Sequence, residues 1–229
     1  NYYSGACITF IKHIIIRFIV VLSIFFSLDF IYTAIYIKGK VIRNKVEFIY
    51  QNNNKQYDYI FLGSSRVEYH VDTDFINKKG NVKSLNLGML GQDLSETFLM
   101  LKLLLDQNIE AEKYFIQIDE LTLAPIYKKT FTEASYFMPY SSNTIVKNHL
   151  KKYDKEYFLD TNFPFYKYMS YGYKIGYREL LLRTVGKAKH NFFNGLDTTV
   201  MKDNKKGYQF KKKYSGKLIY EILSLAKEK

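Results

Sequence analysis

The amino-acid sequence predicts an α/β protein, in which a three-layer, doubly wound parallel sheet follows an N-terminal transmembrane helix. Three observations support this fold class. One apolar run near the N-terminus is 20 residues long, several shorter apolar runs have the length of a strand, and an amphipathic helix lies between two of the short runs. Strands that helices cover on both faces read as continuous apolar runs, so the short runs favour a parallel sheet.

The long apolar run covers residues 18–37 and contains one charged residue, Asp29. A helix rises about 1.5 Å per residue, so this run reaches about 30 Å and matches the hydrocarbon core of a bilayer. A buried core helix is the alternative, but a run without a polar stripe is unusual in a soluble fold. We expect residues 1–45 to form a single-pass cell-membrane anchor that contacts the lipid bilayer. Asp29 should reach the interface or pair with a second helix.

The rest of the chain reads as β-loop-α units. A polar, Asn-rich stretch at residues 46–56 is predicted to be a linker. Strands are predicted at residues 57–63, 82–87 and 114–118, and the first two apolar runs close with Gly. This order and spacing favours parallel pairing, because parallel strands need a crossover connection between them.

A helix is predicted over residues 93–107, between the second and third strands. Asp93 and Glu96 have the spacing of a capping box, in which each side chain accepts a hydrogen bond from the backbone of the other residue. Apolar residues recur on one face of this helix, at Leu94, Phe98, Leu101 and Leu105. That face is expected to cover the sheet.

Residues 125–214 contain all three prolines and many tyrosines, and they are predicted to form a mostly helical, basic and aromatic insertion. Such a surface could bind sugars or lipid headgroups, although Tyr-rich helices more often pack against a sheet. Residues 214–229 read as an amphipathic helix without a stop signal, and the first residue is Asn. Residues 46–229 are therefore expected to be an incomplete α/β domain of a longer protein.

The net charge of +12 comes from residues 126–229, because acidic and basic residues balance over residues 1–125. Lipid headgroups, an acidic glycan or simply a solvated face would account for the excess. Nucleic acid is not expected as a partner, because no recognition motif accompanies the charge. The single cysteine, Cys7, excludes an internal disulfide, and the sequence has no nucleotide- or metal-binding motif, so no cofactor and no metal is expected.

Two loops carry the strongest chemical signal. The first predicted strand leads into FLGSSRVE at residues 61–68, which places a Gly-Ser-Ser turn where open α/β sheets bind ligands. The second strand leads into NLGMLGQD at residues 86–93, where two glycines allow close backbone approach ahead of a helix N-terminus. The first turn alone would be an ordinary strand exit, since Gly and Ser are common turn residues.

Together the loops resemble the first two sequence blocks of the SGNH (GDSL-like) hydrolases and acyltransferases, which have a flavodoxin-like three-layer fold. The resemblance covers residues 57–123. It implies that Ser65 is the nucleophile and that the backbone N–H of Gly91 helps to form the oxyanion hole. The GSSR form is similar to membrane-linked members that modify cell-surface polysaccharides, which implies a soluble domain outside the cytoplasm.

Three positions depart from the family pattern. Ser64 stands where the family usually has Asp. The third block should supply an Asn, but the third strand exits as IDELT, so this position is assigned to Asp119, whose carboxylate would oppose an oxyanion or fix the loop. The Asp-x-x-His block is absent, because no Asp lies three residues before His13, His70, His149 or His190. The general base is therefore expected beyond residue 229.

Two functions remain open. The first is a membrane-anchored serine esterase or O-acyltransferase that acts on acyl groups, foremost acetyl, of a cell-envelope polysaccharide. The second is a catalytically inactive SGNH-like scaffold that binds an envelope polymer or a partner in export or assembly. The presence of both Ser65 and Gly91 favours the enzyme, whereas the altered third block favours the scaffold.

Overall fold

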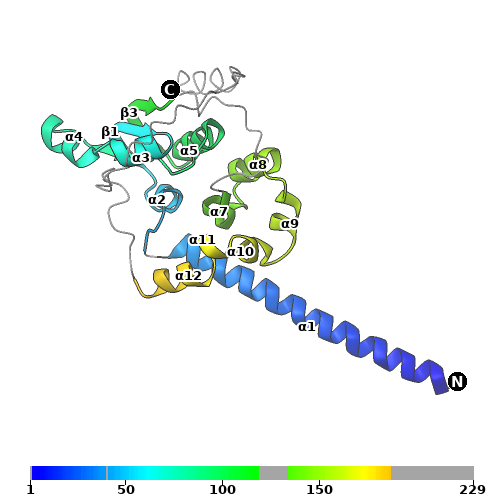
Figure 1. Cartoon of the computed structure of the whole chain (residues 1–229). Helices are drawn as coiled ribbons and strands as arrows, with labels where there is room; N and C mark the ends of the chain where they lie inside the picture. The colour runs from blue at the N-terminus through cyan, green and yellow to red at the C-terminus, as the bar shows by residue number, and fades with distance from the viewer. Residues whose placement is uncertain (1, 40, 119–133, 187–229) are drawn as a thin grey trace, which may run out of the picture.

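The computed structural model describes residues 2–39, 41–118 and 134–186. Up to residue 118 its elements are α1 (Tyr2–Lys38), α2 (Lys45–Gln51), β1 (Lys55–Leu62), α3 (Ser65–His70), α4 (Thr73–Gly80), β2 (Ser84–Asn86), α5 (Leu94–Asp106) and β3 (Ile109–Ile116). From residue 134 they are α7 (Ala134–Phe137), the 3-10 helix η1 (Met138–Tyr140), α8 (Thr144–Tyr153), α9 (Tyr157–Asn162), α10 (Tyr166–Ser170), α11 (Gly172–Ile175) and α12 (Tyr177–Thr184). Figure 1 shows α1 projecting from a body formed by the other elements.

Within the described residues the sheet has three strands in the order β2-β1-β3, and both pairings are parallel. Ile60 of β1 lies between Leu85 of β2 and Tyr114 of β3. The predicted parallel pairing is therefore confirmed, and the fold is α/β. β3 begins at Ile109, earlier than the predicted start at residue 114. The sequence pattern missed its first residues because exposed carboxylates alternate there and leave no apolar run.

The helix between β2 and β3 begins with the predicted capping box. The Asp93 carboxylate accepts from the Glu96 N–H at 2.9 Å, and the Glu96 carboxylate accepts from the Asp93 N–H at 3.0 Å. α5 is buried on more than the predicted face, since Leu99, Met100 and Leu103 are also buried. It contacts β1 and β3 on one side and α2 and α8 on others, so it is the central helix of the core.

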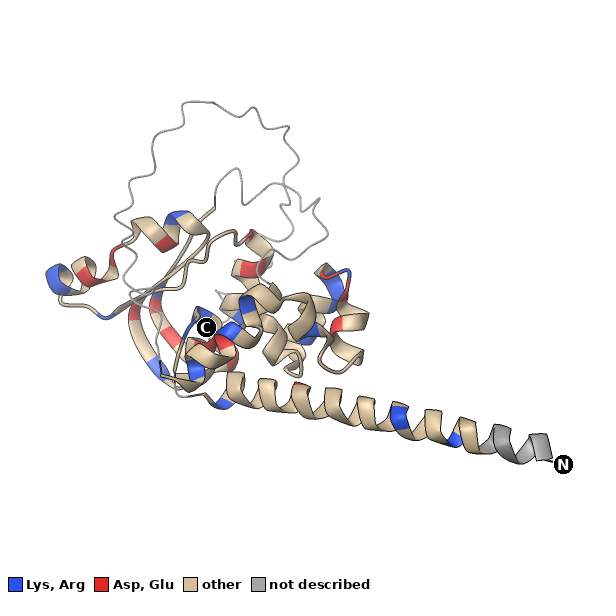
Figure 2. Cartoon of the chain, turned by 60° about the horizontal axis from the view of Figure 1, so that its bottom comes forward, with Lys and Arg blue, Asp and Glu red and all other residues tan. Residues whose placement is uncertain are grey.

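α1 extends beyond both ends of the predicted span and is long and apolar enough to cross a membrane. Figure 2 shows its basic residues near the free end and at the domain end. From Leu22 onward one stripe of α1 packs on the short helices. The Phe25 and Tyr32 rings lie 6.3 and 4.8 Å from the Phe165 ring, and Tyr36 stacks on Tyr168 at 5.8 Å. The last turns of α1 therefore belong to the folded domain.

Asp29 of α1 is paired with a second helix, one of the two outcomes expected from the sequence. Its carboxylate accepts from the Phe165 N–H at 3.0 Å and lies 3.4 Å from the Lys167 ammonium of α10. Phe165 has φ 68°, which is unfavourable for a bulky residue, so its ring and N–H contacts with α1 must offset that strain.

The predicted linker is wrong for residues 46–51, which belong to helix α2. Asn44 caps this helix, and its Val46, Glu47 and Ile49 side chains are buried. Glu47 accepts from the Arg183 Nε of α12 at 2.9 Å, and both residues are at most 6% exposed. The sequence pattern missed α2 because its polar residues are buried by a partner far away in the chain.

A second ion pair joins the same elements. Arg43, between α1 and α2, donates to Glu179 of α12 at 2.6 Å, and the Arg183 guanidinium lies 4.1 Å from the Tyr36 ring centroid. The cluster of Arg43, Glu47, Glu179 and Arg183 therefore fastens the end of α1 and the start of α2 to α12.

We predict that Arg183→Met destabilises the protein by about 3–5 kcal/mol, because it leaves the buried Glu47 carboxylate without its counter-charge. Arg178→Met is the control, since Arg178 is exposed and contacts Glu179 at 3.1 Å only at the surface. Its effect should stay within about 0.5 kcal/mol. Denaturant unfolding of the detergent-solubilised protein measures both values, and equal losses would contradict the prediction.

α9 contains a buried acid. Asp160 is 2% exposed, and burial together with the nearby Asp154 carboxylate raises its pKa to about 7. At this carboxyl the folded state therefore binds more protons than the unfolded state between pH of about 4 and about 7. The contribution of Asp160 to stability should fall as pH rises through this window and level off above it. Buried His149 of α8, whose pKa is lowered to about 3, contributes in the opposite direction over part of the same window.

We predict that Asp160→Asn removes this downward contribution, because the amide stays neutral throughout. Melting temperatures between pH 4 and pH 8, a range set by the ordinary and raised pKa values, should therefore fall less with rising pH, or rise more, in this variant than in the original protein. Asp74→Asn, at an exposed position on α4, should keep the slope of the original protein. An unchanged slope in Asp160→Asn would place the pH dependence elsewhere.

Candidate functional site at the carboxyl edge of the sheet

The loops that leave the three strands meet at one edge of the sheet. The Met89 N–H donates to the Gly63 carbonyl at 2.9 Å, which joins the loops after β2 and β1. The Gln117 N–H donates to the Leu62 carbonyl at 2.9 Å, which brings the exit of β3 to the same place. Parallel strands end at a common edge, and in open α/β sheets this edge is where ligands bind.

Gln117 holds the turn that carries the two serines. Both the backbone N–H and the hydroxyl of Ser64 donate to Gln117 Oε1 at 2.9 Å. The sequence analysis assigned the site residue after the third strand to Asp119 and did not identify Gln117. The amide side chain of Gln117, close to the end of a parallel strand, is the sequence feature that could have indicated it.

Ser65 is the first residue of α3 and is half-buried. The Val67 and Glu68 N–H groups of α3 donate to the Ser64 carbonyl. The Ser65 N–H lies before these bonds, at the helix N-terminus, where backbone N–H groups have no partner within the helix. Its hydroxyl makes no hydrogen bond to the part of the chain that the structure describes. A hydroxyl and an N–H at the same residue are the minimum for a serine nucleophile that also helps to bind an oxyanion.

The loop after β2 packs tightly against α3. A Cβ at Gly88 would lie 2.5 Å from the Glu68 backbone nitrogen and 2.7 Å from Val67 Cβ, so only Gly fits there. The buried Asn86 amide donates to the Val67 and Val71 carbonyls at 2.8 and 2.9 Å, which fixes α3 to β2. Sequence reasoning missed Asn86, although Asn inside an apolar strand is itself an unusual signal.

Gly91, the predicted oxyanion donor, lies further along the same loop in an exposed turn with φ 77°, which favours Gly. The structure thus brings the Gly88–Gly91 loop to the edge that carries Ser65, and it is Gly88 that makes the close backbone contact. Asp119 lies outside the described residues.

A buried cation contacts this edge from the anchor side. The Lys45 ammonium donates to the Gly88 carbonyl, and Lys45 is 3% exposed. Lys45 begins α2, which follows the end of α1 after a short connection. The loop after β2 is therefore linked directly to the segment that leaves α1.

No hydrogen bond joins Ser65 to His13, His70 or His149, the histidines among the described residues. His70 is exposed on α3, with its Nδ1 at 3.0 Å from the Arg66 carbonyl, and His13 lies on α1. His149 is buried on α8, and desolvation with the nearby Lys102 and Lys152 charges lowers its pKa to about 3. It is neutral at physiological pH and lines a cavity of about 240 Å³ between α5 and α8. His190 lies outside the described residues.

Two cavities found among the described residues lie away from this edge. A cavity of about 350 Å³ lies at the opposite end of the strands, lined in part by Tyr57, Lys83 and Glu110. Over residues 2–39, 41–118 and 134–186, no three His, Cys, Asp or Glu side chains come together as metal ligands. The edge that carries Ser65 is the candidate site because the loops after the three strands meet there.

No protein-family model, no curated protein and no solved structure matches the chain. The resemblance to SGNH hydrolases therefore rests on the two loops and stays a prediction.

We predict that Gly63→Ala disturbs the serine turn. The added methyl would lie 2.6 Å from both Gln117 Cβ and Val67 Cγ2, so these side chains must shift, at a cost of about 1–3 kcal/mol. Gly172→Ala is the matched control, because no atom lies within 4 Å of the added methyl. Thermal unfolding should separate the two variants. Equal stability of the two variants would contradict the prediction, because it would show that the turn accepts the methyl group without a loss of folding free energy.

Proposed function

We propose that the protein is a membrane-anchored, SGNH-like serine esterase or O-acyltransferase that acts on acyl groups, foremost acetyl, of a cell-envelope polysaccharide. The observation that carries the proposal is Ser65, at the start of a helix directly after a parallel strand and beside the glycine loop of the next strand. The strand order β2-β1-β3 also fits the beginning of a doubly wound sheet. The polysaccharide follows from the resemblance of the GSSR turn.

In this proposal Ser65 Oγ attacks the acyl carbonyl carbon, and its proton passes to a general base and then to the departing alcohol. The Ser65 and Gly91 N–H groups stabilise the oxyanion of the tetrahedral intermediate. Water or an acceptor hydroxyl then attacks the acyl-serine and releases the acid or the new ester. Ser64 and Gln117 hold the turn that presents Ser65. In this proposal the general base is a residue outside the described part of the chain. Asp119 also lies outside the described residues.

The anchor is part of the proposed function. α1 would cross the cell membrane once, and the domain would lie on the extracytoplasmic side, where an envelope polysaccharide is found. The contact between Lys45 and Gly88 supports a site that works close to the membrane, because it ties the catalytic edge to the end of α1.

A non-catalytic scaffold for an envelope polymer or an assembly partner is the second candidate. It is favoured by the exposed turn at Gly91, and by the finding that no described histidine is hydrogen-bonded to Ser65. The two candidates differ in one measurable property, the nucleophilicity of Ser65.

We predict that a fluorophosphonate probe labels the full-length protein in its membrane and that Ser65→Ala abolishes the labelling, because the probe reacts only with an activated serine. Ser64→Ala is the control, since Ser64 donates to Gln117 and should keep measurable labelling. Labelling that persists in Ser65→Ala would remove Ser65 from the mechanism. No labelling of the original protein would favour the scaffold.

A further inference from the structure

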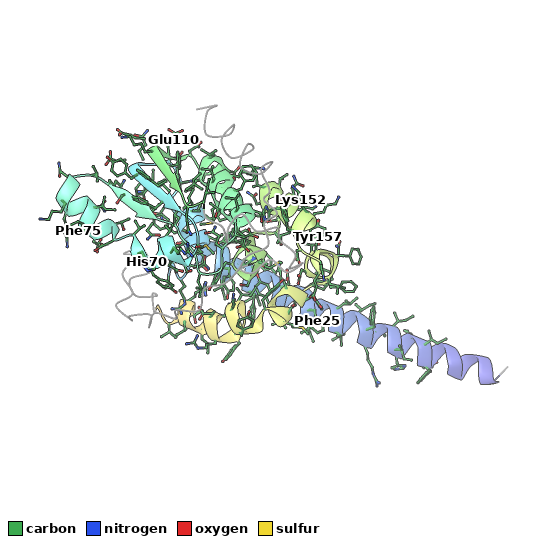
Figure 3. The ribbon with its side chains drawn as sticks, turned by 45° about the horizontal axis from the view of Figure 1, so that its top comes forward. Phe25, His70, Phe75, Glu110, Lys152 and Tyr157 are labelled. Carbon is green, nitrogen blue, oxygen red and sulfur yellow. The ribbon has the colours of Figure 1, made fainter. Side chains whose placement is uncertain are left out.

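Large apolar side chains are exposed on the short helices that pack along α1. Phe158 on α9, Phe163 at its end, Met169 on α10 and Tyr173 on α11 are each more than half exposed. These are four bulky residues within a span of 16 positions, which is unusual on a water-exposed surface. Figure 3 shows Tyr157 of α9 on the side where α1 leaves the body, near Phe25, with Phe75 of α4 on the opposite side.

The length of α1 fixes how far a bilayer would reach along it. A hydrocarbon core needs about 20 helical residues, and the basic residues nearest the free end are Lys12 and Arg17. A span that starts after Lys12 ends at Tyr32, and one that starts after Arg17 ends at Ile37. The first span leaves Phe25 about 10 Å inside the hydrocarbon boundary, a depth that interfacial helices reach, whereas the second would place residues 25–32 near the bilayer midplane. We therefore take the span that ends at Tyr32.

The short helix α10 and the connection before it pack beside the end of this span. Phe165, which precedes α10, contacts both Phe25 and Tyr32 of α1, so the α9–α10 connection lies beside residues 25–32. Asp29 is in this stretch, where the Lys167 ammonium balances its charge and the Phe165 N–H donates a hydrogen bond to it. A paired and hydrogen-bonded carboxylate is the form in which an acid is tolerated at membrane depth.

We infer that α9–α11 form a collar, defined by Phe158, Phe163, Met169 and Tyr173, which inserts into the interfacial region of the leaflet on the domain side. The inference rests on the proposed membrane anchor. The occupant of the surface is the bilayer that α1 crosses, because the collar continues the apolar surface of α1 at the same depth. Aromatic side chains favour this interface, and short helices can lie in it with their apolar face buried by about 5–10 Å.

The collar gives the domain a fixed height above the membrane. α1 is held to α10 by the aromatic contacts and by Asp29, and to α12 by the Arg183 guanidinium over the Tyr36 ring. Since Lys45 links this assembly to the loop after β2, the collar also sets the distance between the edge that carries Ser65 and the lipid headgroups. The substrate would therefore be reached at the membrane surface rather than far from it.

The chain contains no Trp, so single Trp substitutions report on one position at a time. Phe163→Trp and Tyr173→Trp probe the collar, and Phe75→Trp is the matched control, because Phe75 and Phe163 are similarly exposed at 58% and 52%. Phe18→Trp probes the anchor. The full protein is reconstituted in vesicles with or without lipids brominated near the headgroup end of the acyl chain, and Trp fluorescence is measured.

We expect blue-shifted emission and strong quenching for the two collar variants, quenching for Phe18→Trp, and neither effect for Phe75→Trp. Quenching at Phe18 without quenching at Phe163 and Tyr173 would overturn the collar and keep the anchor. No quenching at Phe18 would overturn the anchor itself. Equal quenching at Phe75 would show that the whole domain associates with lipid and would also overturn the collar.

Discussion

The buried pair of Glu47 and Arg183 is the interaction on which the arrangement of the molecule depends. Moving both charges out of water is costly, and the pair is tolerated only when each partner is hydrogen-bonded in place. That requirement fixes α12 against α2, and Tyr36 of α1 packs on the same guanidinium. The position of α2 in turn places Lys45 against Gly88, so one ion pair connects the anchor helix to the edge of the sheet.

The anchor and the domain consequently behave as one body in the described residues. Tyr32, Thr33 and Tyr36 of α1 pack against Phe165 and Tyr168, and the Thr33 and Tyr168 hydroxyls lie 2.7 Å apart. In the described part of the connection between α1 and α2, Arg43 donates to Glu179 and Asn44 caps α2. An enzyme held in this way would meet its substrate in a fixed orientation, in contrast to a domain on a long linker.

Local patterns predicted the elements whose stability is local, and failed where the partner lies far along the chain. The parallel strands, the capping box at Asp93 and the apolar length of α1 follow from nearby residues. α2 could not be predicted, because its buried Glu47 gains its counter-charge 136 positions later. At the site, the loops after β1 and β2 were predicted to carry the candidate residues, but the contact of Gln117 with Ser64 spans 53 positions and was missed.

The pairing of Asp29 has a consequence for how the protein is made. In the proposed anchored protein α1 enters the membrane early in synthesis, whereas Phe165 and Lys167 are added well over a hundred residues later. At about 5–20 residues per second, the ribosome needs on the order of ten seconds to supply them. During that delay the carboxylate has no partner from the folded domain. Stable insertion of the anchor then depends on folding of the chain that follows it. A folding defect near α10 would therefore also impair assembly of the protein in the membrane.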